Sequence, residues 1–346
     1  MGSASWTTGL CSPESDIAVR KIEIASKILV VMFRFLSESL SETVGSRIRR
    51  KSFAVGAMTL LIGGISLGQV NARLLTPTPL NHFYVVLDSA TYKAIEQSSF
   101  LRQDFAVTEQ RTTTRTDITY TGVYFYGANT YFEFFDASAT AIGKLSDSGV
   151  AFGFDKAGAM EASKAALAPR FSILEAPITR HFKEKQVPWF YMAVPSNFSP
   201  SSGLRFWIME YHPRFLAEWN PQAGNRNEGV SRKRILERYA DVLKDTPREP
   251  YLKDVVALTI AVDEPTQKDF VDLCKLLGYR VRPAGTSTLL EGPDIKLRLI
   301  PHTATARGIQ EITMKVDRKP VEQTTFSLGG RSVLRFHGNG LATWSF

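Results

Sequence analysis

One order of elements recurs along this chain and limits the folds open to it: a strand, a helix and then three strands. The stretch 81–88 is rich in β-branched and aromatic residues and predicts a strand. The stretch 89–102 predicts a helix with Ser89 as its N-cap, because apolar residues recur on one face. Three further strands are predicted over 105–115, 120–127 and 130–136.

The same order returns in the next part of the chain. A predicted strand over 149–155 ends in an aspartate, as 81–88 does, and 157–167 predicts a helix. Three more strands are predicted over 171–179, 188–194 and 204–212.

Two of these strands point to an internal repeat. The stretches "TYFEFFD" (130–136) and "FWIMEYH" (206–212) are both rich in aromatic residues, and each carries one glutamate. We therefore expect Glu133 and Glu210 to be repeat partners that point into one shared space.

The C-terminal part repeats the pattern less completely. A turn-rich stretch and a charged helix over 231–244 lead to a strand, a helix and two strands, and then to a strand and a hairpin without a helix. We expect an α+β fold of repeated β-α-β-β-β modules. The predicted parts are an extension with an export signal (1–72), a first paired-module domain (73–219), a linker with a helix (220–253) and a second unit (254–346).

The composition is that of a globular protein, with 44% hydrophobic and 22% charged residues among 346. The formal charge is +8. Residues 1–72 hold eight Lys and Arg against five Asp and Glu, which leaves 34 basic and 29 acidic residues, or +5, on the rest. This excess is too small to indicate a nucleic-acid partner. The two cysteines, Cys11 and Cys274, form no CxxC pair, so a thiolate zinc site is excluded.

The stretch 46–72 has the three parts of an export signal. A basic cluster of Arg47, Arg49, Arg50 and Lys51 precedes an uncharged, mostly apolar run over 53–68, and Val70 and Ala72 fit a small-residue cleavage site. We expect cleavage after Ala72, a periplasmic or secreted product, and no stable membrane insertion afterwards. An uncleaved anchor is the alternative. Residues 1–45 are either a second amphipathic element or sequence upstream of the true start.

The chain resembles the vicinal oxygen chelate superfamily, which includes glyoxalase I, bleomycin-resistance proteins and extradiol dioxygenases. The stretches "NHFYVVLDSATY", "NTYFEFFD", "GVAFGFD" and "MEYHP" are most similar to a bacterial glyoxalase-like domain family of uncharacterised function. The resemblance covers most of 80–346. It implies that two modules pair into a half-open barrel of strands whose concave face holds a divalent metal.

The resemblance also implies metal ligands on the first and last strands of each module. It assigns His82 and Glu133 in the first module and Glu210 in the second, with Gly149 at a position where it cannot coordinate. His212 lies two residues beyond Glu210 and is the substitute ligand. Such a donor set suits Zn, Fe, Mn or Ni.

Each of these residues also has a simpler interpretation. Glu133 can lie on a solvated sheet face, His82 can be a hydrogen-bonded structural histidine, and His212 can cap a loop. If the Glu133 face is buried, an unpaired carboxylate is costly and its pKa must rise. Polar-tipped aromatics on the same strands suit a small-molecule pocket, or ordinary sheet packing. The expected ligand-binding residues are Tyr84, Tyr131, Trp207 and Tyr211.

Two functions remain open. The first is an exported glyoxalase-like small-molecule-binding protein that acts as a divalent-metal-dependent enzyme on a chelating substrate. The second is a non-catalytic protein that binds or sequesters a ligand without metal. The sequence names no catalytic residue and no oligomeric state, and a purely structural role is the outside alternative.

Overall fold

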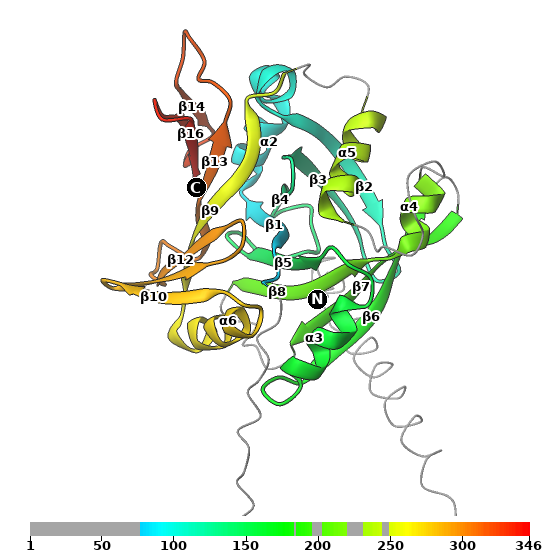
Figure 1. The fold of residues 1–346 in the computed structure, drawn as a ribbon. Coiled ribbons are helices and arrows are strands. Elements are labelled where there is room, and N and C mark those ends of the chain that lie inside the picture. The colour runs from blue at the N-terminus through cyan, green and yellow to red at the C-terminus, as the bar shows by residue number, and fades with distance from the viewer. Residues whose placement is uncertain (1–76, 183–184, 196–202, 220–230, 244–248) are drawn as a thin grey trace, which may run out of the picture. The chain divides into compact units, whose positions relative to one another are not determined.

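The computed structural model describes residues 77–182, 185–195, 203–219, 231–243 and 249–346 (Figure 1). All of these belong to one compact unit, Gln69–Phe346. The predicted export signal and the predictions for residues 1–45 lie outside the described residues. Among the described helices, none has both the length and the apolar character needed to cross a bilayer.

The first two modules share one eight-stranded sheet, which we call sheet A. Its strand order is β2-β3-β4-β1-β5-β8-β7-β6. The two first strands, β1 and β5, pair antiparallel at the centre, and each pairs in parallel with the last strand of its own module. The bounds are β1 (Leu80–Leu87), β2 (Val107–Thr114), β3 (Thr119–Tyr126), β4 (Tyr131–Asp136), β5 (Ser148–Phe154), β6 (Ile173–Phe182), β7 (Lys185–Pro195) and β8 (Leu204–Tyr211).

A second sheet, sheet B, repeats this arrangement strand for strand. Its order is β10-β11-β12-β9-β13-β16-β15-β14. Two of its strands, β10 and β14, were not predicted; both are short strands at the sheet edges. The bounds are β9 (Leu252–Val262), β10 (Arg280–Ala284), β11 (Ser287–Glu291), β12 (Lys296–Pro301), β13 (Gly308–Val316), β14 (Thr325–Leu328), β15 (Ser332–Phe336) and β16 (Leu341–Ser345).

The predicted α+β fold of repeated modules is confirmed. Each of the first three modules places a helix after its first strand: α2 (Ser89–Gln97), α3 (Ala159–Leu167) and α6 (Glu264–Leu276). A short π-helix, η1 (Leu101–Phe105), follows α2. The fourth module passes from β13 to β14 without a helix, as the sequence predicts. Of the predicted linker, 220–253, residues 220–230 and 244–248 lie outside the described residues.

The aspartates that end the first strands of two modules cap the helices that follow. The Asp88 carboxylate accepts the backbone N–H of Thr91, and the Asp263 carboxylate accepts that of Thr266. A carboxylate at this position satisfies an otherwise unpaired amide and faces the positive end of the helix dipole. The prediction of Ser89 as the N-cap of α2 is therefore wrong by one residue, since Ser89 is already helical.

Side chains alternate between the two faces of sheet A. Phe83, Val85, Phe132 and Phe134 lie on one face, in the same apolar cluster as Ile95 of α2 and the inward residues of sheet B. This cluster joins both sheets in one core, with Trp344 of β16 fully buried in it.

The other face of sheet A, which we call the concave face, carries the second apolar cluster. Tyr84, Tyr124, Tyr131 and Phe135 belong to it. At one end the edge strands of sheet A approach each other, because Arg115, just after β2, forms a β-bridge with Arg180 of β6. The sheet therefore curls toward a half-open barrel.

Two helices cover the concave face, and both lie in the sequence between the last strand of sheet A and the first strand of sheet B. Phe215 of α4 (Pro213–Trp219) and Ile235 and Leu236 of α5 (Arg232–Val242) belong to the same cluster as Tyr84 and Tyr124. Figure 1 shows α5 in front of β3. Helix α4 was not predicted, and α5 corresponds to the predicted charged helix.

Candidate functional site

The strand register brings His82 and Glu133 onto the concave face together. Tyr84 of β1 lies opposite Glu133 of β4, and His82 lies opposite Tyr131. Partners in register, and residues two apart on one strand, share a face. The His82 Nε2 and the Glu133 Oε1 are 4.0 Å apart, and both residues are only 6% exposed.

A register shift in β1 gives His82 a polar neighbour. Leu80 is paired with Phe152 and His82 with Ala151, so the pairing shifts between Leu80 and His82 as in a β-bulge. The Asn81 Oδ1 lies 2.8 Å from the His82 Nδ1 and accepts the Tyr211 hydroxyl at 3.3 Å. With the amide oxygen so placed, His82 carries its proton on Nδ1, and its Nε2 is an acceptor.

Burial makes both members of the pair uncharged near neutral pH. Burial lowers the pKa of His82 from 6.5 to about 3, with a smaller contribution from the Arg115 guanidinium. Burial raises the pKa of Glu133 from 4.5 to about 8, although Arg111 and Arg115 oppose that rise. The pair therefore combines a carboxylic acid, which donates, with an imidazole nitrogen, which accepts.

Aromatic rings border the pair. The Tyr131 ring stacks on His82 with centroids 4.6 Å apart, and the Trp207 ring meets His82 edge-on at 5.4 Å. The Trp207 Nε1 is buried and has no hydrogen-bond partner among the described residues. Buried N–H groups normally have a partner, so this indole nitrogen is an unused donor.

A second polar group on this face was missed by sequence analysis. The Glu109 Oε1 accepts the Tyr126 hydroxyl and an Arg111 N–H, both at 2.5 Å. The Arg111 guanidinium lies 4.1 Å from the centroid of the Tyr124 ring. The signal was present in "VTEQRTTT", where Glu109, Arg111 and Thr113 alternate with period two.

Glu210 does not join the site, and the expectation that it shares one space with Glu133 is wrong. Glu210 lies opposite Phe154 of β5, on the face that packs in the main core with α2, α3 and α6. Its two carboxylate oxygens accept the backbone N–H groups of Gly158 and Met160, at 2.8 and 3.0 Å, where α3 begins. Glu210 therefore accepts the first backbone N–H groups of α3, as Asp88 accepts one at the start of α2.

The repeat pairing of the two glutamates is off by three residues. If the strand ends Asp88 and Asp155 are equivalent, the counterpart of Tyr84 is Ala151, and Ala151 lies opposite Trp207. Glu133, which lies opposite Tyr84, therefore corresponds to Trp207. An odd offset along a strand reverses the face of the side chain.

The remaining predicted ligands do not complete a metal site. The His212 Nδ1 accepts the backbone N–H of Arg214 at 3.1 Å, and its ring lies against Tyr191, which is on the face opposite Glu133. A side chain at Gly149 has no room, since a Cβ there would lie 2.1 Å from the Tyr84 ring. No group of three or more His, Cys, Asp or Glu residues fit for a metal ion occurs in the described part of the chain. The donor set does not fit the four-ligand centre that the resemblance implies.

The four predicted ligand-binding aromatics all lie on the concave face. Tyr84, Tyr131 and Tyr211 belong to its cluster, and Trp207 packs against it. Sheet B has no equivalent pair: Arg298 stands opposite Thr259 as Glu133 stands opposite Tyr84, and Ala257 replaces His82. The candidate site therefore belongs to sheet A alone.

The chain is an α+β protein of paired modules with one buried polar site on a concave sheet face. It belongs to the family of unknown function DUF5829, whose model matches residues 80–346. No curated protein sequence matches the chain.

Three solved structures are similar in fold. A hypothetical protein from Staphylococcus aureus shares 12% identity at a TM-score of 0.46, over 75% of this chain and 98% of that one. A 2,2',3-trihydroxybiphenyl 1,2-dioxygenase from Sphingomonas wittichii shares 12% identity at a TM-score of 0.33, over 77% and 89%. A variant of homoprotocatechuate 2,3-dioxygenase from B. fuscum shares 9% identity at a TM-score of 0.35, over 79% and 71%.

Proposed function

We propose that this chain is a binding protein for a small, planar, hydroxylated molecule, which it holds on the concave face of sheet A. The observation that carries the proposal is the buried, uncharged pair of His82 and Glu133, with Nε2 and Oε1 4.0 Å apart. The two atoms are too far apart to hydrogen-bond to each other, and the Glu133 carboxyl also has a hydrogen bond with the Tyr131 side chain. A single hydroxyl group placed between Nε2 and Oε1 can bond to both, because a hydroxyl donates and accepts at once.

A hydroxyl group complements the pair. Its oxygen accepts a hydrogen bond from the Glu133 carboxylic acid, and its own O–H donates a hydrogen bond to the His82 Nε2. The Trp207 N–H, which has no partner among the described residues, is available for a second oxygen of the same molecule. The Tyr131 and Trp207 rings provide apolar surface for a planar ring system.

A divalent metal is the alternative occupant. His82 has the Nδ1 held by Asn81 and the Nε2 directed toward a carboxylate, an arrangement that also suits a metal-binding histidine. In the part of the chain that the structure describes, however, no more than two candidate ligands stand together, whereas stable sites usually have three or four. We therefore propose binding without metal, and we also propose export, which the pattern of residues 46–72 supports.

The test uses a panel of hydroxylated aromatics, with catechol and 4-hydroxybenzoate as members and benzoate as the matched compound without a hydroxyl. Binding is measured by calorimetry and by tryptophan fluorescence on the wild type and on His82→Gln and Glu133→Gln. We expect at least one hydroxylated member to bind, and each variant to weaken its Kd by about tenfold or more, or 1.4 kcal/mol. The control His212→Gln replaces a histidine away from the concave face and should leave Kd unchanged.

Elemental analysis of the same protein for Zn, Mn, Fe and Ni separates the alternatives. A stoichiometric metal that is lost in His82→Gln would replace this proposal with a metal centre. Equal binding of catechol by the wild type and both variants would place the ligand elsewhere.

A further inference from the structure

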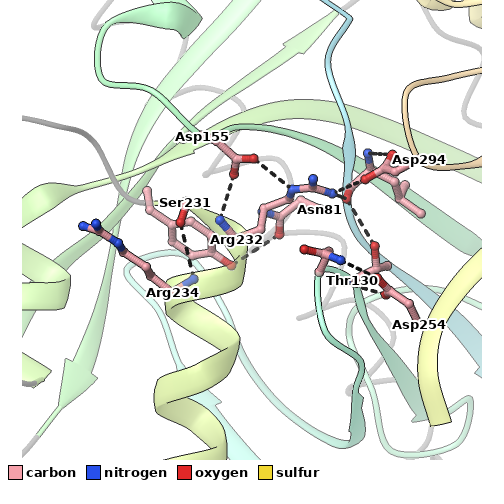
Figure 2. A network of polar contacts seen from close by, with 11 residues as sticks. Asn81, Thr130, Asp155, Ser231, Arg232, Arg234, Asp254 and Asp294 are labelled. Carbon is pink, nitrogen blue, oxygen red and sulfur yellow. Dashed lines mark hydrogen bonds and ion pairs between the residues drawn. The ribbon is translucent and has the colours of Figure 1, made fainter. Parts of the chain in front are cut away.

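The first residue of helix α5, Arg232, is a buried arginine that contacts three separate parts of the chain. Its backbone N–H donates to the Asp155 Oδ1 at 2.8 Å, and its Nε approaches the Asp155 Oδ2 at 3.4 Å. Its Nη1 donates both to the Asp294 carboxylate and to the backbone carbonyl of Leu80. Figure 2 shows Arg232 between Asp155 and Asp294, with Asn81 close by.

Leu80 is the last paired residue of β1 before the register shift, and the shift lies directly before His82 of the candidate site. The next two residues are Asn81, which holds the His82 Nδ1, and His82 itself. The Thr130 hydroxyl also donates to this carbonyl, at 3.4 Å, so Arg232 and Thr130 fix it from two directions. A guanidinium suits such a position, because its fork of donors serves several acceptors at once.

The same arginine begins the helix that covers the site. Ile235 and Leu236 of α5 belong to the apolar cluster of the concave face, as do Tyr84 and Tyr124. His82 and Glu133 are each 6% exposed, so a ligand reaches them only if some of the groups that cover this face move, and α5 is one of these groups. Because α5 begins at Arg232, such a movement strains or breaks the contacts of its guanidinium.

We propose that Arg232 is a positioning residue that couples the closure of α5 over the concave face to the placement of His82. When α5 is in place, Arg232 holds the Leu80 carbonyl, and the shifted segment directs His82 toward Glu133. When α5 leaves, the carbonyl loses this donor, and the imidazole is no longer held in one orientation. The inference rests on the proposed function only for what the site binds, not for the coupling itself.

The test needs no ligand and uses the purified protein with ¹⁵N-labelled histidine. Arg232→Met keeps the length of the side chain and removes its donors, while Arg232→Lys keeps the charge and loses the fork. The variants should still fold, because the side chains of Asp155 and Asp294 are 37% and 29% exposed and water can solvate them. Arg170→Met is the matched control, since it removes a bridge to Asp269 and Asp272 on α6.

Two readouts distinguish coupling from a merely structural tie. We expect the α5 amides to exchange hydrogen at least tenfold faster in Arg232→Met. We also expect the ¹⁵N spectrum of the wild type to show one His82 tautomer, with the proton on Nδ1, and that of Arg232→Met to show a mixture of tautomers. Arg232→Lys should show both effects in weaker form, and Arg170→Met should show neither.

An unchanged His82 tautomer in Arg232→Met, alongside a lower Tm, would overturn the proposal. The same changes in Arg170→Met would overturn it too, because they would reflect general loss of stability. If Arg232→Met does not fold, Asp294→Asn removes the negative charge that pairs with the arginine and should show the same two effects in weaker form. Failure of catechol and the other panel members to bind would contradict the proposed function without affecting these outcomes.

Discussion

A single carboxyl among aromatic residues, Glu133, shows how burial sets chemistry at the scale of the residue. Phe132 and Phe134 point into the main core, while Glu133 points the other way, into a face that α5 covers. Removal from water disfavours the charged form of both Glu133 and His82, so each titrates far from its ordinary pKa.

Glu133 should make the protein less stable as pH rises. The unfolded chain ionises this group near pH 4.5, whereas the folded chain keeps the proton until about pH 8. The free energy of unfolding therefore falls between these two values and levels off above them, by about 1.4 kcal/mol per unit of pKa difference. Glu133→Gln, which mimics the protonated acid, should lose this slope. Urea unfolding at pH 5 and pH 8 measures it, with Glu322→Gln as an exposed control; identical slopes in wild type and Glu133→Gln would contradict the prediction.

His82 should lower the free energy of unfolding as pH falls below 6.5. The unfolded chain binds a proton at this group below pH 6.5, and the folded chain resists protonation down to about pH 3. Its contribution to stability is complete above pH 6.5 and is lost as pH falls. His82→Gln should flatten the fall in Tm between pH 6.5 and pH 4, and the exposed His302→Gln should not. A steeper fall in His82→Gln would show that His82 is charged in the folded state.

At the scale of the element, the first amides of the helices are capped by residues from different strands in the first two modules. Helix α2 takes its cap from Asp88, immediately before it, whereas the first amides of α3 are held by Glu210, far along the chain. Asp155, the counterpart of Asp88, is thereby free to bind Arg232. Asp155 therefore holds the first residue of α5, the helix that covers the concave face.

Glu210→Ala should destabilise the fold by about 2–3 kcal/mol, because it leaves the Gly158 and Met160 amides without their acceptor. Glu210→Gln keeps one acceptor oxygen and should cost about half as much. Neither variant should weaken the binding of catechol or its relatives by folded protein, since Glu210 lies on the other face. Chemical denaturation and calorimetry measure the two effects separately. Loss of binding in a Glu210→Gln protein of normal stability would restore Glu210 to the site.

At the scale of the whole molecule, four modules form two sheets of the same strand order, yet only one sheet carries the polar pair. Sheet B keeps the topology, with Ala257 and Arg298 where sheet A has His82 and Glu133. The β-α-β-β-β module is therefore a scaffold, and the side chains on its concave face decide whether a site exists.

We predict that the chain is exported and that the mature protein begins at Arg73, shortly before β1. The basic cluster, the apolar run and the small residues Val70 and Ala72 motivate this prediction. N-terminal sequencing of the protein recovered outside the cytoplasm measures it. Substituting Ala72→Arg should block the cleavage, because the site requires a small side chain, whereas Arg73→Lys should leave it unchanged. An intact N-terminus in the membrane fraction would favour the uncleaved anchor.

The sequence by itself determined the order of most elements, although not of β10, β14 and α4, because local periodicity and strand-ending aspartates are visible in any short window. The resemblance to the vicinal oxygen chelate superfamily implied that His82 and Glu133 share a face, and the pairing of the first and last strands of the module agrees with it. The two edge strands β10 and β14 escaped prediction because short, polar edge strands have little periodicity.

Only the tertiary structure decided which side of the sheet each repeat presents and what covers it. Because β8 has aromatic residues on both faces, the sequence does not show which residues face the site. The true alignment differs by three residues, so that Glu210 contacts the start of α3 and Trp207 lies at the site. The contacts of Arg232 with Leu80, Asp155 and Asp294 join residues 152, 77 and 62 positions apart. Such long-range packing is set by how the strands pair, and no local pattern encodes that pairing.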